Sequence, residues 1–289
     1  MDLKKVVIPV AGWGTRSLPA TKNVPKEMLP VYRKPVVQYV VEEAMLTGLT
    51  DVVFVNNRNK TIVEDHFDYN LALESVLERM GRDDLLREVR AVAEMANIVT
   101  VRQKVQMGLG HAVLTAREVI GDEPFAVMVG DDLMFGATPG IKQLLDVYRN
   151  EKLPVVGVVE VPAEKVGRYG IINGEEFAPG VYRVRGVVEK PEPGKAPSRM
   201  AMVGRYVLTP EIFTYLEKLE PGVGGEIQLT DALQRMAAES RLLAVKLTGR
   251  RFDCGDWAEY LTANIYFGLQ DDTLRDDLTK MLVDLLPCK

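Results

Sequence analysis

Glycine and basic residues follow the first apolar run of the chain, Val6–Val10. Gly12 and Gly14 come first, and Arg16 and Lys26 lie downstream. Glycine lets the backbone approach a phosphate or a base closely, arginine offers a planar fork to phosphate oxygens, and lysine offers a mobile charge. The glycines alone fit an ordinary tight turn equally well. Basic residues beside a predicted strand end, where open α/β sheets bind ligands, favour a phosphate-binding loop.

Two well-known phosphate loops do not fit this segment. A dinucleotide-binding loop needs a third glycine, where this chain has Ser17, and a helix that begins at once. A Walker A loop needs Gly-Lys-Ser/Thr, which does not follow at the required spacing. A continuous helix is excluded by Pro19, Pro25, Pro30 and Pro35. We therefore expect an extended loop over a ligand, and a nicotinamide-dependent oxidoreductase is disfavoured.

Carboxylates and a further lysine follow other predicted strands. Asp131 and Asp132 come after the apolar run 125–129, and Glu189 and Lys190 come after Val187–Val188. Carboxylates at a strand end suit Mg²⁺, which takes few protein ligands and bridges phosphates. By residue type alone, an Asp-Asp pair is more often a solvated turn and a Glu-Lys pair is more often a surface pair. The position of Glu189 and Lys190 at a strand end favours a functional role, whereas Asp131 and Asp132 by themselves are better explained as a turn, although Asp131 at its strand end can reach a cleft.

Apolar runs alternate with helical spacing over the first 160 residues. The predicted strands are 6–10, 52–55, 98–101, 125–129 and 155–161, and the predicted helices are 36–46, 60–67, 71–80, 84–95, 112–119 and 141–148. This alternation predicts an α/β fold with a mostly parallel, doubly wound central sheet and helices on both faces. Short β-rich pieces between residues 169 and 206 predict a small antiparallel β excursion. The remaining predictions are helices at 210–219 and 229–239, a strand at 242–246, and helices after residue 257.

Composition narrows the class of protein. The chain has 289 residues, of which 47% are hydrophobic, so it can bury a core without disulfides or metals. Its 36 basic and 41 acidic residues give a net charge of −5, which argues against a nucleic-acid partner. Cys254 and Cys288 form no metal or redox motif, and no apolar stretch reaches the ~18 residues of a membrane helix. We expect a cytoplasmic protein with no membrane partner.

Short motifs spread over most of the chain resemble one family. They include residues 12–16, 18–22, 25–30, 102–104, 108–112, 130–132, 168–172, 188–191, 225–232 and 253–256. These segments look like the signature of bacterial UTP–glucose-1-phosphate uridylyltransferases, and the matches run in order from about residue 5 to 265. The resemblance implies a Rossmann-like nucleotidyltransferase fold in a single domain, residues 1–289. It divides that domain into a nucleotide-binding half (1–160), a sugar-phosphate half (161–256) and a C-terminal helical segment (257–289).

The resemblance also implies a reaction. UTP and glucose 1-phosphate would give UDP-glucose and pyrophosphate, by Mg²⁺-assisted in-line attack without a covalent intermediate. Because both reactants are anions, catalysis would consist of positioning and charge neutralisation. The family commonly forms oligomers, so a homodimer or homotetramer is expected.

The resemblance assigns roles to individual residues. Its catalytic residues are Arg16 and Lys26 on the triphosphate and Lys190 on the sugar phosphate, and its metal ligands are Asp131 and Asp253. Its sugar-binding residues are Asp132, Gly170, Glu189 and Val203. Its nucleotide-binding residues are Ala11, Gly12, Gly14, Thr15, Gln103 and Gly108. The Gln103 amide offers both a donor and an acceptor to the uracil edge, whereas His111 is interpreted as structural.

Some positions depart from the family pattern and leave alternatives open. The chain has Trp13, Ser17, Val105–Gln106 and Trp257 where the family usually has other residues. Several of these lie near expected ligand positions, so they bear on nucleotide preference more than on reaction type. One alternative is the same chemistry with dTTP or another sugar 1-phosphate, since a pocket discriminates a single methyl group weakly. Another is a catalytically weak paralogue that regulates an active partner.

Overall fold

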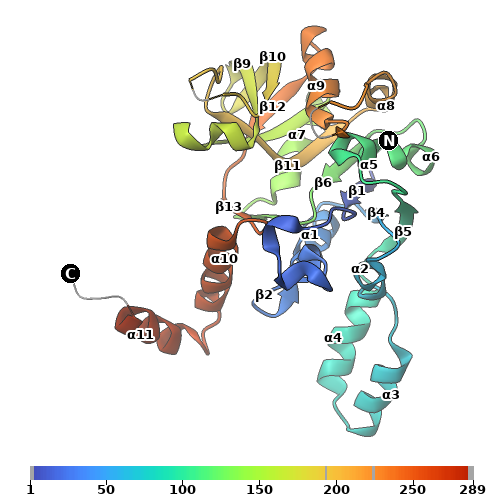
Figure 1. Cartoon of the computed structure of the whole chain (residues 1–289). Helices are drawn as coiled ribbons and strands as arrows, with labels where there is room; N and C mark the ends of the chain where they lie inside the picture. The colour runs from blue at the N-terminus through green and yellow to red at the C-terminus, as the bar shows by residue number, and fades with distance from the viewer. Residues whose placement is uncertain (1–2, 193, 223–224, 286–289) are drawn as a thin grey trace.

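A nine-stranded sheet forms the centre of the computed structural model, which describes residues 3–192, 194–222 and 225–285. Its strand order is β5-β4-β1-β6-β11-β8-β12-β10-β9 (Figure 1). The first four strands run parallel to one another, because helices and long connections return the chain to the same edge. They are β1 (Lys5–Pro9), β4 (Asp51–Asn56), β5 (Asn97–Arg102) and β6 (Phe125–Met128).

The parallel order ends where β11 (Met200–Leu208) enters the sheet between β6 and β8 (Val155–Glu160). β11 pairs antiparallel with both neighbours, while β12 (Leu243–Lys246) is parallel to β8. β10 (Val181–Glu189) and β9 (Gly170–Ala178) form an antiparallel hairpin at the far edge. The predicted α/β fold class is confirmed. Its antiparallel part is larger than the short pieces expected, since β9, β10 and β11 are each nine residues long.

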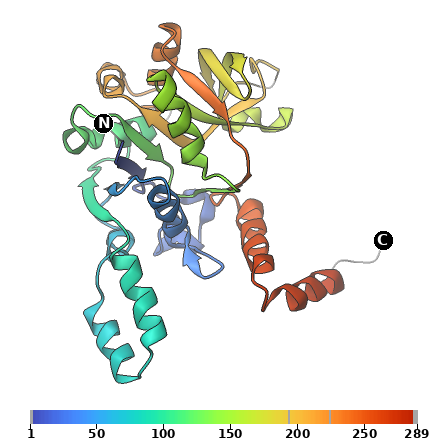
Figure 2. The same ribbon diagram turned by 180° about the vertical axis from the view of Figure 1, so that it is seen from behind.

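Helices cover both faces of the sheet, and each face has its own core. Alternate residues of β1 show this: Val6 and Ile8 pack into one core, and Val7 packs into the other. The first core also takes up α1 (Val36–Met45), α7 (Gly140–Glu151) and α10 (Trp257–Gln270) (Figure 2). The second takes up α5 (Gly108–Thr115), α6 (Arg117–Ile120), α8 (Glu211–Leu216) and α9 (Leu229–Ala238). The single helix expected at 112–119 is thus two short helices with a break at Ala116.

Three smaller features surround the sheet. The helices α2 (Thr61–Asp65), α3 (Leu71–Arg79) and α4 (Asp83–Ala93) follow β4, and α3 and α4 form a hairpin that projects from the body (Figure 1). At the C-terminal end, α10 leads to α11 (Arg275–Leu285), which also projects; the last four residues of the helical segment expected at 257–289 lie outside the described part. Among the described residues, no helix is long and apolar enough to cross a membrane.

Two short ribbons have no counterpart in the sequence prediction. β7 (Asp132–Phe135) pairs antiparallel with β13 (Arg250–Asp253), so that Asp132 lies opposite Asp253. β2 (Pro30–Val31) pairs with β3 (Lys34–Pro35). The loop between β1 and β2 contains three turns of 3₁₀ helix, at Thr15–Ser17, Ala20–Lys22 and Lys26–Met28, and a fourth such helix covers Ala163–Arg168. As the prolines require, no continuous helix forms after β1.

A buried ion pair connects the sheet to α1. The Arg205 side chain on β11 is fully buried, and its guanidinium Nη2 lies 2.6 Å from Glu43 Oε2. Arg205 also donates to the backbone oxygen of Asp132 at 2.7 Å. Glu43 Oε1 in turn accepts from the backbone N–H of Ile141, at the start of α7, at 2.8 Å. This network therefore fixes the start of β7, α1 and α7 against the strand that interrupts the parallel order.

We expect that Glu43→Ala lowers the free energy of unfolding by about 3–5 kcal/mol, because it leaves the Arg205 guanidinium buried without a counter-ion. Urea denaturation of the purified protein measures this. Glu42→Ala is the matched control on the same helix. Glu42 pairs with Lys34 at 2.8 Å in a partly exposed position, so its loss should cost less than about 1 kcal/mol. Equal costs for the two variants would contradict the role given to Arg205.

Candidate active site

The loop after β1 and the residue after β6 meet through one ion pair. Lys26 Nζ lies 2.7 Å from Asp131 Oδ2, and the carboxylate is almost completely buried. Burial alone disfavours a charged carboxylate, but the neighbouring Lys26 ammonium outweighs it and lowers the pKa of Asp131. Burial likewise disfavours the ammonium, and Asp131 raises the pKa of Lys26 above its usual value. Both groups are therefore charged at neutral pH.

Gly255 marks the point where three predicted groups approach one another. A Cβ atom placed there would lie 2.9 Å from Asp131 Oδ2, 3.0 Å from Arg16 Nη2 and 3.0 Å from Asp253 Oδ1. The backbone N–H of Cys254 donates to the Asp131 carbonyl at 2.9 Å, which ties β13 to the end of β6. The structure thus brings the predicted catalytic residue Arg16 together with the two predicted metal ligands.

The two carboxylates fit a hard divalent cation. Burial raises the pKa of Asp253, and the nearby negative charge of Asp131 raises it further. A cation between the two groups would remove this repulsion. No cluster of three or more metal-ligating side chains occurs among the described residues. Two carboxylates, with the other positions left to phosphate oxygens and water, is the ligand set that suits Mg²⁺.

A cavity of ≈250 Å³ contains most of the predicted sugar-binding residues. It is lined by Asp132, Gly170 and Glu189 together with Arg16, Asp131 and Asp253. Glu189 Oε2 accepts a hydrogen bond from Thr230 Oγ1 at 2.7 Å, which fixes that carboxylate at the cavity wall. A Cβ at position 170 would lie 2.6 Å from Met202 Cε and 3.2 Å from Glu189 Oε2, so a larger residue there would require the Met202 side chain to shift.

Three residues that were predicted to act on the sugar or its phosphate do not present a free side chain to this cavity. Asp132 lines the cavity, but its carboxylate accepts from Arg251 Nε at 2.8 Å and from the Gly204 N–H at 2.9 Å. Val203 is buried in the core that contains α1 and does not line the cavity. Lys190 is more than half exposed, with Nζ 3.4 Å from Glu189 Oε1, at the rim and not in the lining.

A second cavity, of ≈380 Å³, contains most of the predicted nucleotide-binding residues. Its lining includes Ala11, Gly12, Thr15, Lys26, Gln103 and Gly108, with Trp13 and Gln106 as further walls. Val129 and Leu109 line both this cavity and the sugar cavity, so the two adjoin. Gly14 does not line it. This residue has a positive φ of 65° and starts the first 3₁₀ turn, a backbone conformation that favours glycine.

Residues that sequence reasoning missed hold the nucleotide loop in place. Lys60 Nζ lies 2.9 Å from Glu27 Oε2 and 2.8 Å from the Val10 carbonyl, and both side chains are buried. Asn57 Nδ2 donates to the Ala11 carbonyl at 2.6 Å. Arg251, whose guanidinium binds the Asp132 carboxylate, is a further residue of this kind. No pattern in the sequence marks a lysine or an arginine as buried, because its partner is distant along the chain.

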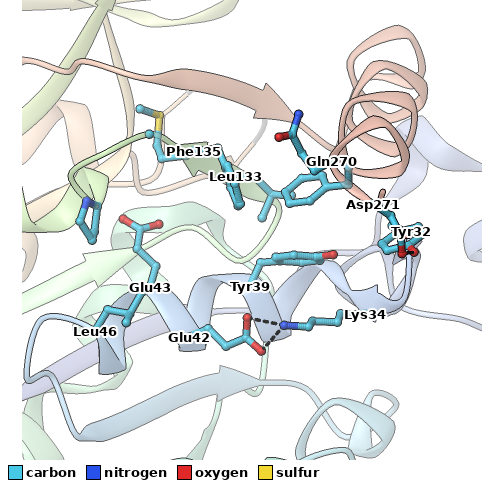
Figure 3. A pocket seen from close by; sticks show the side chains of 14 residues that line it. Tyr32, Lys34, Tyr39, Glu42, Glu43, Leu46, Leu133, Phe135, Gln270 and Asp271 are labelled. Carbon is cyan, nitrogen blue, oxygen red and sulfur yellow. Dashed lines mark hydrogen bonds and ion pairs between the residues drawn. The ribbon is translucent and has the colours of Figure 1, made fainter. Parts of the chain in front are cut away.

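A further, mainly apolar hollow lies elsewhere. This cavity of ≈510 Å³ is bounded by α1, β7 and α10, and Figure 3 shows Tyr39, Phe135 and the Lys34–Glu42 pair around it. None of the predicted site residues lines it. Its volume therefore does not mark it as the candidate site; the two adjoining cavities are the better candidates, because they contain most of the predicted site residues.

We expect Gly255→Ala to lower kcat by about 100-fold, because the added Cβ would displace side-chain atoms of Arg16, Asp131 and Asp253. The free energy of unfolding should change by less than about 2 kcal/mol, since only side-chain ends must move. Gly186→Ala is the control, because its nearest contact would be the Gln234 side chain at 3.4 Å. Wild-type turnover by the Gly255 variant would show that the three groups need not converge.

Comparisons with known proteins agree with this geometry. The model of the nucleotidyl transferase family matches residues 5–267. A UTP–glucose-1-phosphate uridylyltransferase of Staphylococcus haemolyticus is 50% identical over 98% of this chain and 99% of its own length. The enzyme of the same name from Bacillus subtilis is 48% identical over 98% of this chain and 97% of its own length.

Solved structures give the same result. A UDP-glucose pyrophosphorylase complexed with UDP-glucose matches 93% of this chain and 100% of its own, with a TM-score of 0.86 and 42% identity. The UTP-bound enzyme from Acinetobacter baumannii matches 99% of this chain and 100% of its own, with a TM-score of 0.90 and 36% identity. The chain thus belongs to the nucleotidyl transferase family and, within it, to the UTP–glucose-1-phosphate uridylyltransferases.

Proposed function

We propose that this enzyme transfers a uridylyl group from UTP to glucose 1-phosphate, giving UDP-glucose and pyrophosphate. The observation that carries this is the convergence of Arg16, Lys26, Asp131 and Asp253 where the two cavities adjoin. The nucleotide cavity is large enough for a base and ribose, and the sugar cavity carries carboxylates for hydroxyl groups. The relatives' names and the UTP and UDP-glucose bound to the solved structures support the same substrates.

The chain's own charges account for the transfer. A phosphate oxygen of glucose 1-phosphate attacks the α-phosphorus of UTP in line, and pyrophosphate leaves with the electrons of the broken P–O bond. Arg16 and Lys26 approach from the nucleotide loop and neutralise the triphosphate. Lys190, on the flexible rim of the sugar cavity, supplies charge to the incoming sugar phosphate. No side chain needs to form a covalent bond with the substrate.

Asp131 and Asp253 would hold Mg²⁺, which neutralises charge on the phosphates when it is bound. Asp131 is engaged with Lys26 at 2.7 Å in this structure. With Mg²⁺ held by Asp131 and Asp253, the Lys26 ammonium would be free to contact the triphosphate, to which it would supply positive charge.

Carboxylates that other side chains hold in place recognise the sugar. Glu189, held by Thr230, faces the cavity and accepts hydrogen bonds from sugar hydroxyls. Asp132 contributes mainly through its bond to Arg251, which orients the wall, while Gly170 provides space. A pocket of this kind favours glucose 1-phosphate. It distinguishes two sugars that differ in the orientation of one hydroxyl group only if a carboxylate contacts that hydroxyl group.

A pyrophosphate-release assay with Mg²⁺ tests the function. UTP with glucose 1-phosphate should be the best pair, and removal of the metal by EDTA should abolish release. A dTTP rate well above the UTP rate would replace the uridylyl assignment by a thymidylyl one. Galactose 1-phosphate tests the sugar in the same way. No release above background with any pair would favour the regulatory paralogue.

We expect Asp131→Asn and Lys190→Ala each to lower kcat by roughly 10²–10³-fold, since each removes a charge that the transition state needs. Circular dichroism should be unchanged. Lys195→Ala is the matched control for Lys190. Lys195 lies in the same loop and pairs only with exposed Glu192, so its loss should leave kcat intact. Near-wild-type activity in either test variant would mean that the residue has another role.

We further propose a single nucleotidyltransferase domain that works in the cytoplasm as a homodimer or homotetramer. The C-terminal helix α11 supports the oligomer, because none of its residues is buried within one chain and Met281 and Leu285 are exposed. A helix of this kind gains stability when its apolar face is covered. The covering surface would come from a second copy of the chain.

Light scattering after size exclusion should give a mass of two or four chains at micromolar concentration. Met281→Asp places a charge on the face of α11 that we expect to be covered, and it should shift the mass toward the monomer. Asp284→Lys, on the same helix, controls for a general effect of changed charge. A monomeric wild-type protein would contradict the oligomer.

A further inference from the structure

The amide of Gln103 has no free donor. Gln103 lies at the end of β5 and lines the nucleotide cavity. Its Nε2 lies 3.3 Å from the Gly108 carbonyl oxygen and 2.8 Å from His111 Nδ1. A carbonyl oxygen only accepts, so the nitrogen of the amide must face Gly108, and its second hydrogen is donated to His111. Oε1 is then the only polar atom of this side chain left for a ligand.

The position of His111 is itself rigid. It lies on α5, where the backbone N–H of Gly110 donates to the Ile227 carbonyl at 2.9 Å. A Cβ at position 110 would lie 2.7 Å from that same oxygen, so glycine lets the helix approach Ile227 this closely. Burial also lowers the pKa of His111, which favours the neutral imidazole with an acceptor at Nδ1. The acceptor that faces Gln103 is therefore held in place.

From this geometry we propose that His111 is a positioning residue that fixes the Gln103 amide, so that the site presents an acceptor alone to the nucleobase. The inference rests on the proposed function and refines its substrate class. Uracil and thymine carry an N3–H donor that suits this acceptor, whereas cytosine carries a lone pair at N3 that would face the lone pairs of Oε1. His111 thereby contributes to the choice of UTP over CTP, a role beyond the structural one expected from the sequence.

The chain contains a natural comparison. His66 and Gln38 form the other histidine–glutamine pair, with His66 Nε2 3.0 Å from Gln38 Oε1. Gln38 Nε2 donates to Glu42 Oε1 at 2.9 Å, so in this pair the glutamine oxygen accepts from the histidine. The hydrogen-bond roles are thus reversed, and the pair lines neither the nucleotide nor the sugar cavity. It provides a control for loss of an imidazole elsewhere.

The test is the ratio of kcat/KM for UTP to that for CTP, with glucose 1-phosphate as the second substrate. His111→Ala frees the amide to rotate and should lower this ratio by about tenfold or more. His111→Asp places an acceptor-only oxygen close to where Nδ1 lies, so it should keep the ratio within about threefold of wild type. His66→Ala should leave the ratio unchanged.

Two results would overturn the proposal: an unchanged ratio in His111→Ala, or an equal loss in the alanine and aspartate variants, which would indicate packing alone. If His111→Ala does not fold, His111→Leu, which keeps the volume without an acceptor, replaces it. Calorimetric dissociation constants for UTP and CTP repeat the comparison without turnover. A wild-type protein that binds UTP over CTP but releases no pyrophosphate would contradict the proposed function and leave the positioning role measurable.

Discussion

The arrangement of the candidate site depends on the ion pair between Lys26 and Asp131. It joins the loop after β1 to the end of β6, two segments about one hundred residues apart in sequence, at a distance of 2.7 Å. Such a pair is favourable in a buried place only when its geometry is good and further polar contacts surround it. Glu27 and Lys60 provide those contacts next to Lys26, and the Arg16 guanidinium provides a favourable charge near Asp131. The Asp253 carboxylate opposes the charge of Asp131, so the site combines basic groups that suit phosphates with a pair of carboxylates that would suit a cation.

The two cavities lie at different parts of the sheet, one at the ends of parallel strands and the other beside β11, the strand that interrupts the parallel order. β1, β5 and β6 end at the nucleotide cavity, as strands of an open parallel sheet do. β11 then runs antiparallel beside β6 and contributes to the wall of the sugar cavity through Met202 and Tyr206. The two cavities meet at Val129, immediately after β6. Reactants bound on either side are therefore brought together by the sheet itself.

The sequence predicts the elements whose own residues carry a clear apolar pattern. Strands such as 52–55 and helices such as 229–239 have strong apolar periodicity, and the structure confirms them. β7 and β13 are four residues each, and they become strands only because they pair with one another. The Lys60–Glu27 and Arg205–Glu43 pairs were unpredictable for the same reason, since burial of a charge depends on a distant partner. The Gln103 amide was expected to offer both a donor and an acceptor to a base, and in the structure its Nε2 lies within hydrogen-bonding distance of the Gly108 carbonyl and of His111 Nδ1.

The ribbon of β7 and β13 has a consequence for how such enzymes can diversify. It closes a long excursion of the chain, because Asp132 and its partner Arg251 are 119 positions apart and Asp253 pairs with Asp132. The β9–β10 hairpin lies within this excursion, at the edge of the sheet, so a change in its length would leave Asp132 paired with Asp253. β11 lies in the same excursion but cannot vary as freely, because Gly204 and Arg205 bind Asp132 and Glu43. The part of the sugar cavity that β9 and β10 supply is therefore the part that insertions can alter most readily.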